Sequence, residues 1–193
     1  MLGVRGVPVL VIPCRAKAQY CIEDYPCIVD NGWCQSGQPS VQELKENIMR
    51  YRPQFAIALD FDLKTSLRLK ERYPWIKWVY PAHKREELKV WRYGFLVGFC
   101  TRRRMPNQGR EYTLREYLSE VPRGYRFLLG LSWEDLFELP LDEFDYADVA
   151  FVFSNARFGK DLRGRRTSRV DPRQMLIELE QLIRSIRRIT DYL

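Results

Sequence analysis

The sequence predicts an α/β fold, a minimal or incomplete TIM-type (β/α) barrel with parallel strands and a C-terminal helix, formed by a single domain over residues 1–193. Short β-rich runs alternate with helical or looped stretches, a pattern typical of parallel strands joined by helices. A complete (β/α)8 barrel usually needs about 200 to 250 residues, so this chain is expected to form a reduced version. No linker, repeat or low-complexity tract indicates a second domain.

Seven strands are expected from short apolar runs, over residues 7–12, 27–30, 55–60, 76–80, 95–100, 126–131 and 148–153. Several runs end in polar or small residues, as at Asp30, Asp60, His83 and Ser132. The carboxyl ends of parallel strands meet on one face of a barrel. We therefore expect carboxylates from different strands to converge there and to form the functional site.

The helices lie between and after these strands. Capping-box patterns begin at Ser40, Thr113 and Ser132, each with an acidic residue three positions later. The last helix is expected to begin at Asp171, with Pro172 at its first position. Its apolar residues then recur with helical period, which predicts that this helix packs on the sheet.

The composition indicates a folded chain, with 46% hydrophobic and 13% aromatic residues. The apolar runs are too short for a bilayer span. Residues 1–13 are interrupted by Pro8 and are not followed by a small-residue cleavage site, so they predict a first strand and not a signal peptide. We expect a cytoplasmic protein.

The cysteines indicate neither a zinc site nor a complete disulfide framework. There are five, an odd number, and no C-x-x-C pair occurs. Buried or unpaired thiols that serve packing are the favoured interpretation, with a disulfide or a metal as the alternatives. His83 is the only histidine, which argues against multi-histidine metal centres and histidine-centred hydrolase chemistry.

Positive charge is concentrated in the second half of a chain whose net charge is +7. Residues 84–126 contain 11 basic and 5 acidic residues, and residues 157–193 contain 10 basic and 5 acidic. The densest clusters fall in segments with Gly or Pro and so are expected in loops. Arginine binds phosphate through a planar fork of donors, which favours a nucleic-acid partner, and a plain solvated loop is the alternative. The phosphate-binding candidates are Arg102, Arg103, Arg104, Arg157, Lys160, Arg163, Arg165 and Arg166.

Several segments, in order, resemble the tRNA-guanine transglycosylase superfamily, which includes enzymes that insert deazaguanine bases into DNA. Residues 27–35 are similar to that family's strand ending in D-S-G-G-F-Q, and residues 53–60 to its P-D-x-x-M-A-F-D strand. Residues 126–136, 144–148 and 155–159 resemble R-Y-L-M-G-V-G-x-P-E-D-L, V-D-M-F-D and N-A-R-N-G. A weaker match is residues 94–98, similar to G-L-A-I-G-G.

This resemblance implies a barrel enzyme that exchanges a purine base in tRNA or DNA. It implies Asp148 as the nucleophile that attacks C1′ and forms a covalent aspartyl-nucleotide intermediate, which an incoming deazapurine resolves. A carboxylate suits the oxocarbenium-like state of N-glycosidic cleavage. Asp30, at another strand end, is the candidate acid and base for the proton on the departing and arriving purines.

The remaining candidates would bind the base. Asp60 is expected to hydrogen-bond the purine edge, Gly98 to permit close approach of the base to the backbone, and Tyr80 or Trp33 to stack on it. For Asp30 and Asp60 a helix N-cap role is the structural alternative.

The chain also departs from the family pattern. It lacks the C-x-C-x-x-C zinc module, since no cysteine follows Cys100, so we expect no zinc and no other cofactor. It also lacks the Q-G-G that reads the base, and the corresponding strand ends at residues 80–83. These differences fit the DNA-modifying branch, or an archaeal or viral relative, better than a housekeeping tRNA enzyme.

Two other functions stay open. One is a non-catalytic nucleic-acid-binding barrel within a modification complex, and the other is a base-releasing glycosylase or nucleoside hydrolase. The expected partners are nucleic acid and a purine or 7-deazapurine base, with no membrane. The exposed flank of an incomplete barrel would favour a homodimer.

Overall fold

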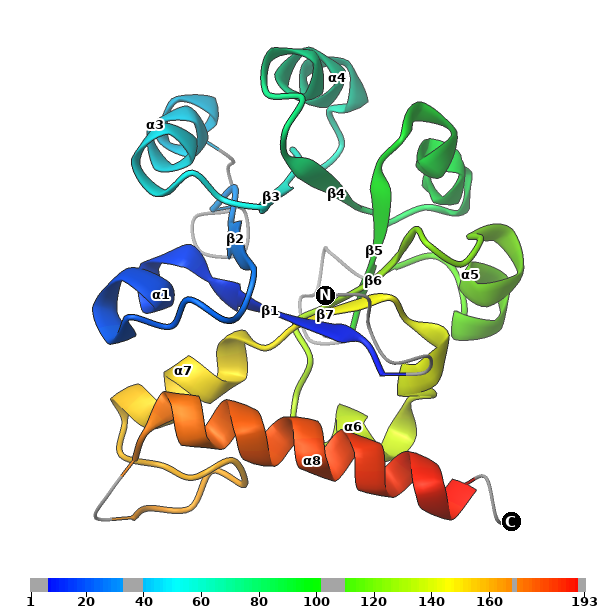
Figure 1. Cartoon of the computed structure of the whole chain (residues 1–193). Coiled ribbons are helices and arrows are strands. Elements are labelled where there is room, and N and C mark those ends of the chain that lie inside the picture. The colour runs from blue at the N-terminus through cyan, green and yellow to red at the C-terminus, as the bar shows by residue number, and fades with distance from the viewer. Residues whose placement is uncertain (1–6, 33–39, 102–109, 168–169, 191–193) are drawn as a thin grey trace.

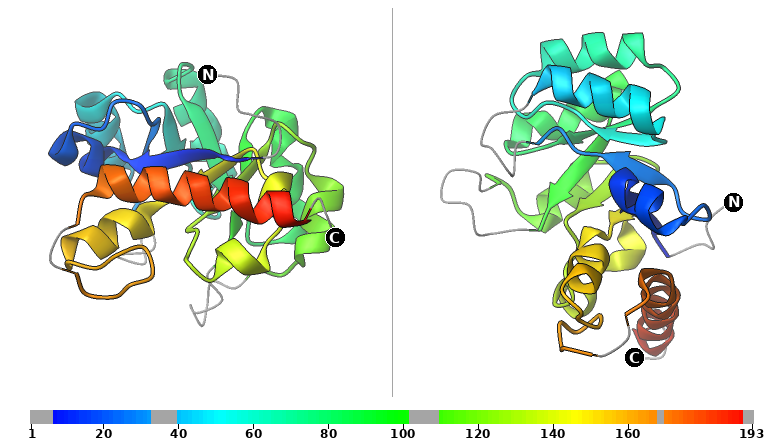
Figure 2. Two further views of the ribbon diagram at one scale, coloured as in Figure 1. Left: turned by 60° about the horizontal axis from the view of Figure 1, so that its bottom comes forward. Right: turned by 90° about the vertical axis from the view of Figure 1, so that its left-hand side faces the viewer.

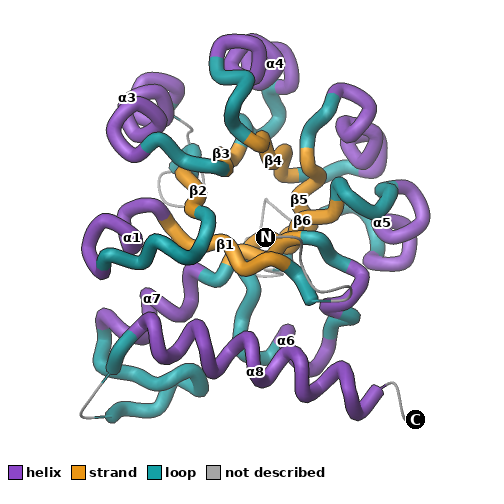
Figure 3. Tube along the Cα trace, in the orientation of Figure 1, coloured by secondary structure: helices purple, strands orange, loops and turns teal. Residues whose placement is uncertain are grey.

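Seven parallel strands close into a barrel in the order of the sequence, and the last strand pairs back with the first. Figure 1 shows this ring with helices around it, and Figure 3 shows the strand segments arranged in a ring. The computed structural model describes residues 7–32, 40–101, 110–167 and 170–190, the last four without side chains. The expected TIM-type barrel with a C-terminal helix is confirmed.

The strands are short. They are β1 (Val9–Pro13), β2 (Cys27–Val29), β3 (Phe55–Ile57), β4 (Lys77–Pro81), β5 (Leu96–Cys100), β6 (Arg126–Leu129) and β7 (Tyr146–Asp148). The helices are α1 (Cys14–Tyr20), α3 (Val41–Tyr51), α4 (Leu63–Arg72), η1 (Arg85–Tyr93), α5 (Leu114–Glu120), α6 (Asp135–Glu138), η2 (Leu141–Glu143), α7 (Ala150–Arg157) and α8 (Pro172–Thr190).

Alternation along the strands divides the core into two parts, because successive side chains of a strand point to opposite faces. One buried cluster fills the inside of the barrel and consists of Val11, Ile28, Phe55, Val79, Leu96, Phe127 and Leu129. The larger cluster lies between the barrel and the helices and contains the intervening strand residues, such as Ile12, Val29 and Trp78. Every strand is therefore buried on both faces, which positions its carboxyl end firmly.

The predicted helix starts at Ser40, Thr113 and Asp171 are present, whereas α6 begins at Asp135 with Glu134 as its N-cap and not directly after Ser132. The Ser40 hydroxyl accepts a hydrogen bond from the Glu43 amide, and Thr113 forms a complete capping box with Glu116. Helix α8 lies along the side of the barrel next to α7 (Figures 1 and 2). Its apolar stripe buries Met175, among other residues, as expected.

The seventh strand differs from the prediction. We expected residues 148–153, but β7 ends at Asp148 and the apolar run that follows forms α7. The β-prone run buries Val152 and Phe153 on one helical face, and the Phe153 ring packs 6.0 Å from that of Tyr20. The correction moves Asp148 from the start of a strand to the carboxyl end of one.

Two further expectations need correction. Each described strand has a partner on both sides, so the open flank that would favour a dimer does not occur in the described barrel. The interpretation of all cysteines as packing thiols is also wrong, because Cys14 and Cys27 form a disulfide that ties the end of β1 to the start of β2. Cys21 is an exposed free thiol.

Candidate active site at the carboxyl ends of β2 and β7

Asp30 and Asp148 both reach the inward-facing layer at the carboxyl end of the barrel. On β2, Ile28 points inward, so Asp30, two residues later, lies on the same side; on β7, Tyr146 and Asp148 are related in the same way. Strand β1 alone separates β2 from β7 in the ring, so the two strands are about 10 Å apart.

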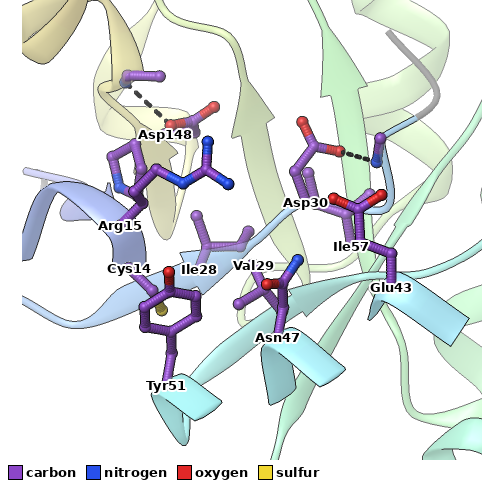
Figure 4. A pocket seen from close by; sticks show the side chains of 13 residues that line it. Cys14, Arg15, Ile28, Val29, Asp30, Glu43, Asn47, Tyr51, Ile57 and Asp148 are labelled. Carbon is purple, nitrogen blue, oxygen red and sulfur yellow. Dashed lines mark hydrogen bonds between the residues drawn. The ribbon is translucent and has the colours of Figure 1, made fainter. Parts of the chain in front are cut away.

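One pocket contains both carboxylates, with a cavity of about 250 Å³. Its apolar floor includes Ile28, Val29 and Ile57. Figure 4 shows Asp148 and Arg15 on one side and Asp30 and Glu43 on the other, with Asn47 and Tyr51 of α3 along the edge. The cavity is slightly smaller than the roughly 300–1,000 Å³ of most drug-sized ligand pockets, so its size suits a single ring system.

Backbone amides orient both carboxylates. Oδ1 of Asp30 accepts a hydrogen bond from the Gly32 amide at 3.0 Å, and Oδ1 of Asp148 accepts one from the Ala150 amide, also at 3.0 Å. Gly32 adopts a left-handed φ of 81°, which an L side chain rarely takes, so this turn depends on glycine. Both carboxylates are thus held by turns at the point where their strands end.

Arg15 supplies the positive charge of the pocket. It lies in α1 directly after Cys14, and the Cys14–Cys27 disulfide fixes this junction to β2. The Arg15 side chain is exposed and lies on the same side of the pocket as Asp148 (Figure 4). A guanidinium at this position can bind an anionic group such as a phosphate.

Asp60 lies in a different environment, a buried hydrogen-bonded cluster outside the lining of this pocket. Its Oδ1 lies 2.7 Å from Nε2 of His83, and its Oδ2 accepts a hydrogen bond of 2.8 Å from Nδ2 of Asn31. Asn31 also donates to the carbonyl oxygen of Ala58. The cluster joins the ends of β2, β3 and β4, so the predicted contact of Asp60 with a purine edge lacks an open approach in this structure.

Phe61 closes this cluster on one side. Its ring stacks on the His83 ring with centroids 4.5 Å apart, although the side chain is 47% exposed. Phe61 has a left-handed φ of 60°, a conformation that costs a non-glycine residue roughly 1–2 kcal/mol. The contact with His83 helps to offset that cost.

The structure places Gly98 and Tyr80 in the core. A Cβ atom at Gly98 would collide with the Leu129 side chain and lie 3.2 Å from the Tyr80 carbonyl oxygen, so the missing side chain serves packing inside the barrel. The Tyr80 ring lies in the outer core, 5.8 Å from the Phe95 ring. Burial and, after it, the Glu87 carboxylate raise the pKa of the Tyr80 hydroxyl above its ordinary value. Neither residue lines the pocket with Asp30 and Asp148.

The predicted basic loop after α7 forms a small hairpin. Lys160 and Arg166 pair as an antiparallel bridge, and Arg165 makes an ion pair with Asp161 at 3.1 Å. The Arg163 guanidinium lies over the Trp133 ring at 5.6 Å, which brings the hairpin to the loop that follows β6. The hairpin therefore lies on the carboxyl-end side, next to the strand that bears Asp148.

Aromatic side chains accompany this charge. Trp133 makes an edge contact with Phe137 at 5.5 Å, and the Arg157 guanidinium lies 6.0 Å from the Phe158 ring centre. Phe137 and Phe158 are both mostly exposed. Exposed rings beside arginines are typical of surfaces on which single-stranded bases stack.

Four predicted residues lie outside the described part of the chain: Trp33, Arg102, Arg103 and Arg104. Within the described residues no three His, Cys, Asp or Glu side chains are grouped to hold a metal ion, and the expectation that zinc is not needed stays a prediction. None of the described helices has the length and apolar character required to cross a membrane.

Arg15, Glu43, Asn47 and Tyr51 are pocket residues that sequence reasoning missed. The last three are spaced by four along α3, next to the buried Leu44 and Ile48. That polar spacing was the available signal, but the direction in which α3 presents it depends on tertiary packing. No protein-family model, curated protein or solved structure matches the chain.

Proposed function

We propose that this chain is a nucleic-acid base transglycosylase that exchanges guanine for a deazapurine. The observation that carries the proposal is the shared pocket of Asp30 and Asp148, whose side chains project inward from strand ends on either side of β1. Paired carboxylates that flank the glycosidic bond are the usual machinery for its cleavage. The resemblance in sequence agrees with this arrangement.

Asp148 is the nucleophile in this mechanism. Its carboxylate attacks C1′ of the target nucleotide, and a C1′–O bond forms as the C1′–N9 bond breaks, with the bonding electron pair leaving on the purine. Protonated Asp30 donates a proton to the departing guanine and becomes the carboxylate. That carboxylate then removes the proton from the incoming deazapurine, which attacks C1′ and releases Asp148.

The surface around the pocket supports a nucleic-acid substrate. Arg15 lies beside Asp148, and the basic hairpin approaches the neighbouring loop through Arg163 and Trp133. Phosphate contacts position a nucleic acid without reading its sequence, while ring stacking holds exposed bases. A hydrolase for free nucleosides would not need this surface.

The test is incorporation of labelled guanine and labelled 7-deazaguanine into bulk tRNA and into duplex DNA. Label in either polymer is expected with the wild type, and Asp148→Asn should lower incorporation by at least about 1,000-fold because no covalent intermediate forms. The amide retains an oxygen for the Ala150 hydrogen bond, so the fold should persist. Asp142→Asn, an exposed aspartate of η2 outside the pocket, is the control.

Other outcomes point to the alternative functions. Release of free guanine without incorporation would identify a base-releasing glycosylase that uses the same two carboxylates. Salt-dependent binding of nucleic acid without release or incorporation would identify a non-catalytic binding barrel. Incorporation that is unchanged in Asp148→Asn would overturn the proposed nucleophile.

A further inference from the structure

A groove separate from the candidate active site lies at the amino ends of β3 and β4. It is lined by Ile48, Met49, Arg52 and Trp75, and its cavity is about 420 Å³. Arg52 caps the C-terminus of α3 and Trp75 follows α4, two helices that are neighbours around the barrel (Figure 1). Because these helices return the chain to the amino ends of the strands, the groove lies at the opposite end of the barrel from the candidate active site.

Backbone pairing holds the two sides of the groove together. The Lys77 amide donates a hydrogen bond of 3.0 Å to the Gln54 carbonyl oxygen, where β3 and β4 begin. The Trp75 ring makes an edge contact with the buried Tyr73 ring, with 5.4 Å between the ring centres. The groove is therefore a built part of the fold.

The surface of the groove is apolar and open to solvent. The Met49 side chain is 65% exposed and the Trp75 side chain is 60% exposed, with buried Ile48 beside them. Exposed apolar side chains that lie side by side are typical of interaction sites. Tryptophan, methionine and arginine are the residues enriched in the centres of protein–protein interfaces, so the composition favours a protein partner.

The charge around the groove is positive. Arg52 lines it, and Lys45 lies seven positions earlier, on the same face of α3. The Arg72 guanidinium lies 5.8 Å from the centre of the Tyr73 ring that Trp75 contacts. Within the described residues none of these three cations makes an ion pair, and no carboxylate lines the groove. The groove therefore complements a negatively charged partner.

We propose that this groove binds an acidic segment of a partner protein. The segment inserts a bulky apolar side chain between Met49 and Trp75. Carboxylates on either side of it pair with Lys45, Arg52 and Arg72. The net charge of +7 opposes the approach of a second copy of this chain and attracts an acidic partner. The inference goes beyond base exchange, because the groove and the candidate active site share no lining residue.

The experiment selects short peptides from a random displayed library on the immobilised full chain and measures their affinity, after synthesis and labelling, by fluorescence anisotropy. Enriched peptides should carry a bulky apolar residue among Asp and Glu. Trp75→Ala should weaken their binding by about tenfold or more, because aromatic anchors carry much of the affinity at such sites, and Trp75→Phe should retain most of it. Tyr93→Ala is the matched control, because it removes another exposed aromatic side chain outside the groove.

A charge reversal tests the electrostatic part of the inference. Arg52→Glu should weaken binding of the same peptides by about three- to tenfold, and the affinity of the wild type should fall as the salt concentration rises. Arg50→Glu makes the same change in net charge at an exposed position of the same helix that does not line the groove, so its effect should be clearly smaller.

Three results would overturn the proposal. One is a selection that yields no acidic peptide whose binding depends on Trp75. The second is self-association of the wild type in sedimentation equilibrium that Trp75→Ala abolishes, which would assign the groove to a second copy. The third is binding of single-stranded oligonucleotides that Trp75→Ala abolishes and the selected peptides do not displace, which would assign the groove to nucleic acid.

Discussion

Two groups of acidic side chains lie at the carboxyl end of this barrel, and their surroundings are opposite. Asp30 and Asp148 line an open pocket, whereas Asp60 is 8% exposed and bonded to Asn31 and His83. All three aspartates lie at or shortly after the carboxyl end of a strand. A position at a strand end is therefore not enough to identify a reacting carboxylate.

The direction of the side chain makes the difference. Asp30 and Asn31 are consecutive, yet Asp30 is exposed in the pocket and Asn31 is 4% exposed in the buried cluster. Alternation along a strand sends neighbours to opposite faces, so one residue of register separates a reactive position from a structural one. The same turn thus contributes to the candidate site and to the support beneath it.

The largest effect that tests this comparison is expected at Asp30. Asp30→Asn should lower base exchange by about 100- to 10,000-fold, because the amide cannot carry the proton between the two purines. Its oxygen still accepts the Gly32 hydrogen bond, so the free energy of unfolding should change by less than about 0.5 kcal/mol. Incorporation assays and urea unfolding of the same preparation measure both quantities. A variant that retains exchange would remove Asp30 from the mechanism.

The opposite result is expected at Asp60. Asp60→Ala leaves buried His83 without the partner of its Nε2 and removes one bond of Asn31, so it should lower the free energy of unfolding by about 2–3 kcal/mol. Urea unfolding of Asp60→Ala, His83→Ala and the double variant gives the coupling between them, which should be near 1–2 kcal/mol. Unchanged stability together with lost exchange would break the comparison and return Asp60 to the role of a base reader.

Much of the fold can be predicted from the sequence because local signals agree with the global structure. The runs that became β1 to β6, the caps at Ser40 and Thr113, and helix α8 each carry their own pattern. The prediction of a strand over residues 148–153 was wrong because apolar, β-prone residues also suit a short buried helix. A strand of three residues is enough to close this barrel.

Only part of the candidate site could be predicted from the sequence. Asp30 could be chosen because it ends a predicted strand, whereas Asp148 was implied by the resemblance and was expected at the start of a strand. The structure brings both residues to one pocket. The roles of His83 and the Cys14–Cys27 disulfide depend on distances across the fold, which a spacing of 23 or 13 residues does not encode. The orientation of α3, which brings Glu43 to the pocket, likewise comes from tertiary packing.

The smallest expected effect concerns Asp62, a carboxylate two residues beyond Asp60 that serves only a helix. Its side chain accepts a hydrogen bond from the Thr65 amide at the start of α4, and this bond holds the pKa of Asp62 below its ordinary value. Because the folded-state pKa is the lower one, the stabilisation is present above the unfolded pKa of about 3.9 and is lost as the pH falls through the folded-state pKa. Asp62→Ala should cost about 1 kcal/mol at neutral pH without lowering exchange.

The pH dependence separates the charge of Asp62 from its capping geometry. Asp62→Asn preserves a capping oxygen but does not titrate, so any advantage of the wild type over this variant should shrink as the pH falls below about 4. Urea midpoints of both proteins across that range measure the change. A difference that stays constant with pH would show that the Asp62 charge does not contribute. A loss of exchange in either variant would extend the reactive group beyond Asp30 and Asp148.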